Sequence, residues 1–350
     1  MNKEIRIGNH YISENSPAYI IAEMSANHNM DYDRAVRIVR AAKEAGADAI
    51  KIQTYTADTI TLDCDAPDFQ ITQGTLWDGR TFHDLYAEAY TPWEWQPKLQ
   101  ELAKELDIDF FSSPFDFTSV DFLEEMKVPA YKVASYEITD IPLIRKIAAL
   151  KKPVIISTGI AMEEDIELAL KTCKEAGNEN VILLKCCSAY PSPYEDINLR
   201  TMVDMAERFD CLTGLSDHTE GHAVSCAAVA MGARVIEKHL TLRRADGGVD
   251  SAFSMEPEEF AEMVKNIRIS EKAMGQVTYE LTKKQISGRD FSRSLYIAED
   301  MEAGDVFTED NLRSVRPGFG LHPKYYDEIL GRRVTHAVTK GTPLKWDLVE

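Results

Sequence analysis

The chain has 350 residues, of which 44% are hydrophobic, and a formal net charge of −19. This length favours one large and one small domain. The acidic excess argues against nucleic acid or an anionic membrane surface as a partner. The six cysteines form no CxxC pair and no disulfide-scaffold spacing, so reduced thiols are expected. The sequence shows no apolar signal segment and no run of membrane-spanning length, and we expect a cytoplasmic protein.

Short apolar runs alternate with amphipathic stretches from Ala18 to about Met274. Strands are expected at residues 19–22, 49–53, 109–112, 130–134, 153–157, 181–185, 212–215 and 234–238. Helices are expected at residues 32–45, 92–106, 120–126, 141–150, 163–176, 199–209, 223–231 and 257–274. Eight strands, each followed by a helix, are typical of an α/β fold, the (β/α)8 TIM barrel. The first strand lacks the glycine-rich turn of a doubly wound sheet, so we predict the barrel.

Two stretches depart from this alternation. Residues 55–89 form a long, aromatic and acidic insertion; at a barrel rim such a connection is more often functional than not, and a loop held by its own aromatic side chains is the alternative. Residues 276–290 are polar and are expected to link a barrel domain (1–275) to a small β-rich domain (291–350) with strands at 294–297, 312–315 and 333–338. Because such a domain buries little core, we expect docking onto, or exchange with, a partner chain.

Two histidines, His218 and His239, stand at the ends of the last two predicted barrel strands. In a barrel, both imidazoles would emerge at the C-terminal rim, where these folds build active sites. Neutral imidazole is a good ligand for Mn²⁺, Zn²⁺ or Fe²⁺, and a two-histidine site with open positions could polarise a substrate carbonyl. Either histidine alone could instead cap a helix or form hydrogen bonds with the backbone of a loop. Their equivalent positions favour a metal.

Two lysines, Lys51 and Lys132, lie in otherwise apolar strands. Burying an unpaired ammonium is costly, so each should meet an anion or a carboxylate. Together with strand-end hydroxyls they would form a cradle for a phosphate or carboxylate group. These hydroxyls belong to Ser113, Ser135, Ser157 and Ser216. The alternatives are an ion pair with Glu23 or Glu137 and a Schiff-base lysine, but several cations beside a histidine pair favour anion binding.

Two acids complete the predicted rim. Glu23 ends the first strand in an apolar setting, where it could act as a general base, hold an attacking water or simply pair with a rim lysine. Asp250 follows the second histidine closely and could bind sugar hydroxyls or support the metal ligands.

A series of motifs runs through most of the chain: IAE at 21–23, NHN at 27–29, KIQT at 51–54, SSPFD at 112–116, YKVAS at 131–135, STG at 157–159, YP at 190–191, GLSDH at 214–218, EKH at 237–239 and RPG at 316–318. In this order they resemble the sialic acid synthase family, which condenses phosphoenolpyruvate (PEP) with an N-acetylated amino sugar to make nonulosonic acids. The resemblance implies a barrel followed by an antifreeze-like (SAF) domain. It also implies a domain-swapped homodimer, in which the small domain covers the partner's active site.

Within this family, the insertion resembles that of the pseudaminic acid synthases, through GTLWDGR at 74–80 and DLYAEAYTPWEW at 84–95. That branch uses 2,4-diacetamido-2,4,6-trideoxy-L-altrose rather than N-acetylmannosamine. The chain departs from the commoner sialic acid pattern at Met30 and Val249, where glycine and proline are usual, and at Ser188, in the motif that usually carries asparagine. The last change bears on substrate contacts and fits a different sugar.

The resemblance also assigns roles by position. His218 and His239 would hold Mn²⁺ or Mg²⁺, and Glu23 would be the catalytic acid or base. PEP would contact Lys51, Ser113, Lys132, Ser135, Ser157 and Ser216, with the two lysines also acting in catalysis. The sugar would contact Gln53, Tyr190 and Asp250, and Arg316 would reach its N-acetyl group from the partner subunit. The implied process is carbohydrate biosynthesis, such as flagellin glycosylation.

Three alternatives stay open. A related synthase could make N-acetylneuraminic or legionaminic acid, which differs only in the sugar substrate. A PEP-dependent aldose-phosphate synthase on the same barrel would need a second phosphate site. A non-catalytic carbohydrate- or ice-binding protein would need neither the strand-end lysines nor the histidines.

Overall fold

The computed structural model describes all 350 residues, which divide into two compact units, residues 1–275 and 276–350. In unit 1, eight parallel strands close into a barrel because the last strand, β10, pairs with the first, β3. The barrel strands are β3 (Tyr19–Glu23), β4 (Ala49–Thr54), β5 (Asp109–Pro114), β6 (Tyr131–Val133), β7 (Val154–Ser157), β8 (Val181–Cys186), β9 (Leu212–Asp217) and β10 (Val235–His239). The predicted TIM barrel is confirmed.

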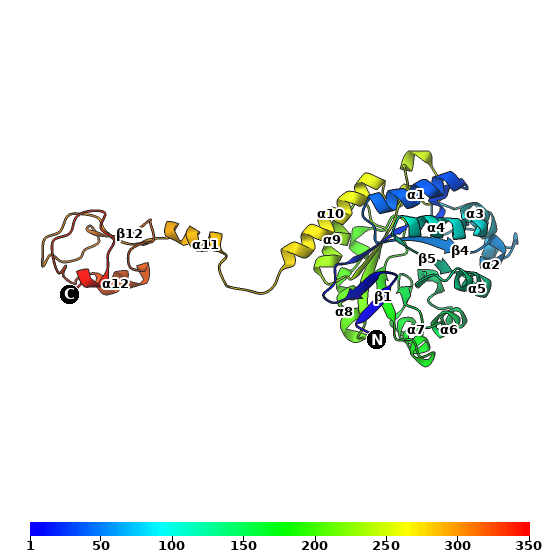
Figure 1. The fold of residues 1–350 in the computed structure, drawn as a ribbon, viewed down its shortest axis with the longest axis horizontal. Coiled ribbons are helices and arrows are strands. Elements are labelled where there is room, and N and C mark those ends of the chain that lie inside the picture. Colours follow the sequence, from blue (N-terminus) through cyan, green and yellow to red (C-terminus); the bar gives the residue numbers. More distant parts are fainter. The chain divides into compact units, whose positions relative to one another are not determined.

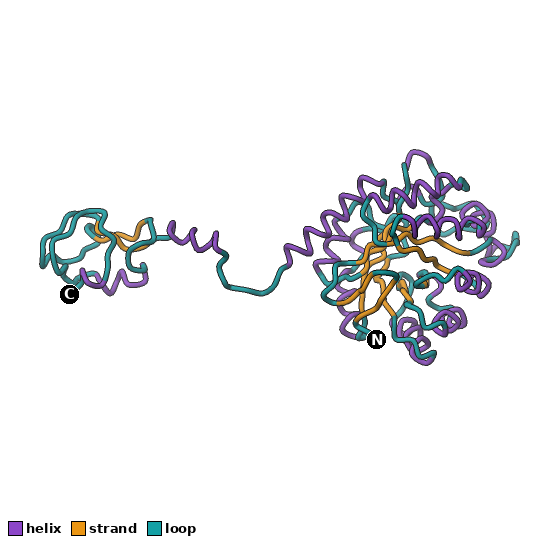
Figure 2. Tube along the Cα trace, in the orientation of Figure 1, coloured by secondary structure: helices purple, strands orange, loops and turns teal.

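Helices surround the strands of unit 1, with the strands as the inner layer (Figures 1 and 2). They are α1 (Tyr32–Glu44), α2 (Ala57–Ile60), α3 (Phe82–Ala89), α4 (Gln96–Glu105), α5 (Phe117–Glu125), α6 (Ile141–Ala149), α7 (Glu163–Glu175), α8 (Leu199–Arg208), α9 (Ala223–Ala230) and α10 (Pro257–Met274). Several begin where the sequence supplies a cap: the side chains of Asp31, Asp116 and Asp140 accept backbone N–H groups of α1, α5 and α6. Each helix expected around the barrel is present, although residues 92–95 precede α4 rather than belong to it.

The strands are buried on both faces, as their apolar sequences require of a parallel sheet covered by helices. Ile20, Ile155 and Ile236 are fully buried, and burial of each such side chain contributes about 1.5–3 kcal/mol. Gly214 on β9 is needed for the packing of its neighbour, since a Cβ there would lie 2.1 Å from the carbonyl oxygen of Val235. The two strands that carry the histidines therefore approach each other closely.

An N-terminal hairpin, β1 (Glu4–Ile7) and β2 (His10–Ser13), precedes the barrel and was not predicted. Ile5, Ile7 and Ile12 are buried and belong to the core of unit 1. The alternation of Ile5 and Ile7 with exposed residues, followed by Gly8 at a positive φ of 54°, is the signal of a strand and a turn that could have located it.

Unit 2 contains α11 (Lys283–Gly288), an antiparallel pair of strands, β11 (Ser294–Ile297) and β12 (Leu312–Val315), and α12 (Tyr326–Ile329). The two strands were predicted, but the third, at 333–338, is wrong: only isolated bridges form there. Val334 and Val338 are buried, but His336, which would share their face in a strand, is exposed, so the alternation of a strand is not kept. The expectation of little core also needs correction, because Phe307, Leu312 and Ile329 are fully or almost fully buried within this unit.

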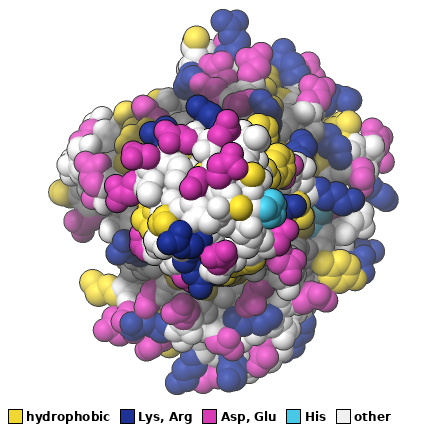
Figure 3. Space-filling view, turned by 90° about the vertical axis from the view of Figure 1, so that its left-hand side faces the viewer, with side chains coloured by type: hydrophobic (Ala, Val, Ile, Leu, Met, Phe, Trp, Pro, Cys, Tyr) yellow, Lys and Arg dark blue, Asp and Glu magenta, His cyan; other side chains and the backbone are white.

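None of the helices is both long and apolar enough to cross a membrane. All six cysteines are free thiols, three of them buried. Acidic and basic side chains are mixed across the face shown in Figure 3, with hydrophobic side chains scattered between them.

Candidate active site

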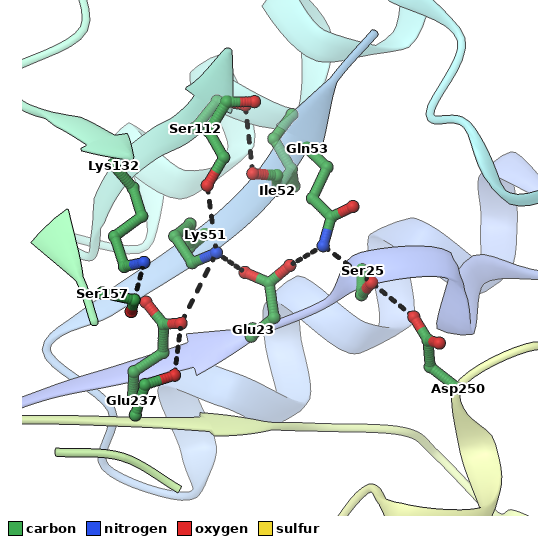
Figure 4. A network of polar contacts seen from close by, with 12 residues as sticks. Glu23, Ser25, Lys51, Ile52, Gln53, Ser112, Lys132, Ser157, Glu237 and Asp250 are labelled. Atoms are coloured by element: carbon green, nitrogen blue, oxygen red, sulfur yellow. Dashed lines mark hydrogen bonds and ion pairs between the residues drawn. The ribbon is translucent and has the colours of Figure 1, made fainter. Parts of the chain in front are cut away.

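A buried ion-pair cluster occupies the rim formed by the C-terminal ends of the barrel strands (Figure 4). The ammonium of Lys51 lies 2.6 Å from Glu23 Oε2 and 3.7 Å from Glu237 Oε1, and it donates to Ser113 Oγ at 3.3 Å. These residues come from β4, β3, β10 and β5, which are consecutive around the barrel. Glu23 therefore pairs with a rim lysine, one of the three roles that the sequence left open.

The second lysine, Lys132 on β6, is 2% exposed. It donates to Ser157 Oγ at 2.7 Å and to the carbonyl oxygen of Val133 at 3.0 Å, and no carboxylate lies within 4.0 Å of its ammonium. Burial lowers the pKa of Lys132, while Glu237 raises it and Lys51 lowers it further. Since its direct hydrogen-bond partners are neutral, the buried ammonium of Lys132 could still pair with an incoming anion.

Glu237 is a functional candidate that the sequence analysis missed. Burial by itself would raise the pKa of Glu237, but Lys132, Lys51 and His218 outweigh it and lower the pKa. Burial raises the pKa of Glu23, and the opposing effect of Lys51 does not cancel it. Glu237 is thus the carboxylate that stays charged, and Glu23 is the better proton acceptor of the two. The sequence did contain a signal for Glu237, because it is an acidic residue in the apolar run that leads to His239, just as Glu23 is an acidic residue at the end of an apolar run.

A chain of hydrogen bonds connects this cluster to Asp250. Gln53 Nε2 donates to Glu23 Oε1 at 3.0 Å and to Ser25 Oγ at 3.0 Å, and Ser25 Oγ donates to Asp250 Oδ2. Lys51 and Gln53 lie two residues apart on β4 and so project on the same side of the strand. The candidate sugar contacts Gln53 and Asp250 are therefore brought together, through Ser25, which the sequence analysis did not single out.

The two histidines also meet. His218 follows β9 and His239 ends β10, and their ring centroids are 5.3 Å apart. Nδ1 of His218 is within hydrogen-bonding distance (3.0 Å) of the carbonyl oxygen of Cys187, which leaves Nε2 available. Nδ1 of His239 is buried and has no hydrogen-bond partner. Burial and the nearby cations lower the pKa of His239 well below its usual value, so this imidazole is neutral, as metal ligation requires.

The donor set fits a divalent metal with open positions. No group of three or more His, Cys, Asp or Glu side chains is arranged as a metal site, so the protein would supply two imidazole nitrogens, and solvent or substrate would supply the rest. A metal bound here would explain why Nδ1 of His239 is buried without a hydrogen-bond partner, beside His218, whose Nε2 is available.

The remaining predicted contacts lie at the strand ends as expected. Ser135 Oγ accepts from Ser188 Oγ at 2.9 Å, which places the residue that departs from the family pattern next to a predicted PEP contact. Ser216 Oγ donates to Glu237 Oε1 at 3.1 Å. Glu137, considered as an ion-pair partner for the lysines, forms no such pair, and its Oε2 is buried without a partner.

A cavity of about 490 Å³ opens at this rim. The barrel lines it with Gln53, Glu137, His239 and Asp250, among others, and the insertion adds a second set of lining residues: Ile60, Ile71, Trp77, Phe82, Leu85 and Tyr86. Tyr190 lies between the two sets, with ring centroids 4.5 Å from His218 and 5.9 Å from Trp77. The insertion is therefore part of the site. Another cavity, of about 500 Å³ near Asp109, contains none of the predicted site residues.

Arg316 is the one predicted site residue outside unit 1. It belongs to unit 2, where it is exposed directly after β12. All other predicted site residues lie in unit 1.

Comparison with known proteins identifies the family. Residues 38–279 match the model of the NeuB family, and residues 292–350 match that of the SAF domain. This chain belongs to the NeuB family. A sialic acid synthetase structure from Leptospira borgpetersenii has a TM-score of 0.72 and 32% identity, covering 81% of this chain and 94% of that one. The resemblance found in the motifs is confirmed.

Relatives within the family differ in similarity. The pseudaminic acid synthase of Campylobacter jejuni (strain 81-176) is 46% identical, over 97% of this chain and 98% of that protein. The pseudaminic acid synthase of Helicobacter pylori is 44% identical, over 95% and 98%. The N,N'-diacetyllegionaminic acid synthase of Legionella pneumophila is 36% identical, over 95% and 94%. The chain is thus more similar to these pseudaminic acid synthases, as the insertion motifs predicted.

Glu137 yields a pH-dependent prediction. Burial raises the pKa of Glu137 from 4.5 to about 7, which Lys132 opposes and Asp140 reinforces. The folded state therefore binds more protons than the unfolded state between these values, and the stability that Glu137 contributes is lost as pH rises through about 7. Relative to the wild type, Glu137→Gln should gain thermal stability between about pH 5 and about pH 8. The exposed-site change Glu105→Gln on α4 should show no such gain, and a Glu137→Gln difference that does not vary with pH would contradict the assignment.

Proposed function

We propose that this chain is a pseudaminic acid synthase, which condenses PEP with 2,4-diacetamido-2,4,6-trideoxy-L-altrose and releases phosphate by C–O cleavage. The observation that carries the proposal is Lys132, a buried ammonium without a carboxylate partner, beside the paired Lys51. Two relatives named pseudaminic acid synthase, at 44–46% identity over nearly the whole chain, support the choice of sugar.

PEP binding follows from the charges of the rim. The phosphate and carboxylate of PEP are anionic, and Lys51 and Lys132 with the hydroxyls of Ser113 and Ser157 would hold them by charge-assisted hydrogen bonds. Glu23 and Glu237 keep Lys51 in place before PEP arrives. Holding PEP and the sugar face to face would account for much of the rate acceleration.

The reaction then requires a nucleophile, a water and a proton acceptor. C3 of PEP attacks the aldehyde carbon of the open-chain sugar, whose oxygen takes up a proton from solvent to become a hydroxyl, and positive charge develops at C2. Water adds to C2 and gives its proton to Glu23, whose raised pKa makes it a stronger base than an ordinary carboxylate. The tetrahedral intermediate collapses with cleavage of the C–O bond to phosphate. A divalent metal on His218 and His239 would polarise the aldehyde carbonyl.

Further features extend the proposal. We expect a homodimer in which Arg316 reaches the sugar bound by the other subunit. Mn²⁺ or Mg²⁺ as the metal, a cytoplasmic location and a role in flagellin glycosylation also stay predictions. N-acetylneuraminic or legionaminic acid synthesis is the alternative that shares the same chemistry.

The reaction can be tested by measuring phosphate release from PEP in the presence of Mn²⁺. Release with the altrose derivative, and little with N-acetylmannosamine, is expected, and a chelator should abolish it. Turnover of N-acetylmannosamine alone would keep the chemistry and overturn the sugar assignment. No release with either sugar would contradict the proposal.

The metal site can be tested without turnover. Mn²⁺ binding can be followed by the electron paramagnetic resonance signal of the free ion. The affinity should weaken about 100-fold in His239→Ala, because losing an outer-shell partner alone costs about 10- to 100-fold and His239 would be a direct ligand. His222→Ala is the control, since His222 contacts Asn266 on α10 and lies outside the cavity lining. Equal Mn²⁺ affinity in both variants would rule out the histidine pair as the metal site.

A further inference from the structure

The insertion contributes apolar side chains to the lining of the cavity. Ile71 and Leu85 are buried, Phe82 is half-buried, and all three line the cavity from the same insertion. We call these three side chains the apolar wall. The barrel contributes the opposite chemistry, since Ser25, Gln53, His239 and Asp250 line the same cavity. The cavity therefore offers a ligand both polar groups and an apolar surface.

Contacts between aromatic rings hold the apolar wall in place. Phe82 stacks on Tyr86 within α3 at 6.1 Å between ring centroids, and Tyr86 meets Tyr55 edge to face at 5.6 Å. Tyr55 in turn contacts Phe115, after β5, at 5.1 Å. The wall is thus fixed to the ends of β4 and β5.

Trp77 fastens the insertion at another point. Its indole N–H donates to the carbonyl oxygen of Val249 at 3.2 Å, next to Asp250. The insertion also adds polar groups to the lining, namely the hydroxyls of Tyr55 and Tyr86 and the exposed side chains of Gln73 and Thr75. Gln73 accepts from the backbone N–H of Thr72, and Thr75 donates to Asp78. The buried part of the wall offers a ligand methyl and methylene groups and an aromatic ring.

The ion-pair cluster fixes which end of the sugar meets the wall. Lys51 contacts Glu23, which bonds to Gln53, and Gln53 lies at the polar edge of the cavity. PEP held by the lysines must therefore meet the sugar aldehyde at this polar edge, next to His239. An open-chain sugar with its aldehyde at this edge would extend its C6 end into the rest of the cavity, which residues of the insertion line.

We propose that the apolar wall of Ile71, Phe82 and Leu85 binds the C6 methyl group of the sugar and selects 6-deoxy sugars against their 6-hydroxylated counterparts. The inference rests on the proposed function and assigns a specificity role to the insertion. A 6-hydroxyl pressed against this wall would lose its water without gaining a hydrogen bond. Rejection of an added hydroxyl by an apolar surface reaches about 100-fold.

The test compares two sugars that differ by one hydroxyl. Phosphate release from PEP is measured with 2,4-diacetamido-2,4,6-trideoxy-L-altrose and with its 6-hydroxylated counterpart, and the ratio of their kcat/KM values is the readout. Leu85→Gln should lower this ratio at least about tenfold, by weakening use of the 6-deoxy sugar and improving use of the hydroxylated one. The KM for PEP should not change. Phe82→Gln, at a half-buried position, should lower the ratio in the same direction if Leu85→Gln does not fold.

Leu76→Gln is the matched control, because Leu76 belongs to the same insertion but is exposed and does not line the cavity. It should leave the ratio unchanged. An unchanged ratio in folded Leu85→Gln and Phe82→Gln, or an equal loss with both sugars, would overturn the inference and leave the proposed function standing. A wild-type protein that releases no phosphate with the 6-deoxy sugar would overturn the proposed function, and the inference with it.

Discussion

The buried ammonium of Lys51, held between Glu23 and Glu237, is the interaction on which the rest of the site depends. Removing these charges from water is costly, and their attraction offsets the cost only when the geometry is good. Closure of the barrel supplies that geometry, since β10, β3 and β4 are adjacent, with Glu23 opposite Lys51 and Glu237 opposite Ile21, two residues before Glu23. In our proposal, the cluster holds the ammonium of Lys51 in place for PEP, with a carboxyl of raised pKa, Glu23, beside it.

The cavity is lined by two parts of the chain, the barrel rim and the insertion, which contribute different chemistry. Strands that run in parallel end at the same rim, so chemistry-bearing residues far apart in sequence converge there. The charged cluster and the histidine pair belong to this rim and fit the reaction that NeuB family members share. In our proposal, the insertion meets the part of the sugar that does not react. A change of substrate within the family can thus be made in the insertion without altering the charged cluster.

Much of this site was readable in the sequence because strand ends in a barrel are predictable. A charged or polar residue near the end of an apolar run, as at Lys51, Lys132 or His239, predicts a position at the C-terminal rim of the barrel, whatever the neighbouring strands are. The pairings were not readable, because they depend on which strands become neighbours and at what register. Lys51 pairs with Glu237, a residue 186 positions away that lies in a motif noted mainly for its histidine. The same limit applies to residues 333–338, whose apolar residues suggested a strand but form only isolated bridges, with His336 exposed between Val334 and Val338.

The most direct test of the account is the affinity of the protein for PEP when Lys132 loses its charge. Isothermal titration calorimetry would compare the wild type, Lys132→Met and Lys152→Met, a control in which the lysine pairs with Glu124 at the surface. Loss of one charge-assisted contact of about 1.5–3 kcal/mol should raise the Kd for PEP in Lys132→Met by about 10- to 150-fold. The control should bind PEP like the wild type. Unchanged PEP affinity in a folded Lys132→Met protein would contradict the account.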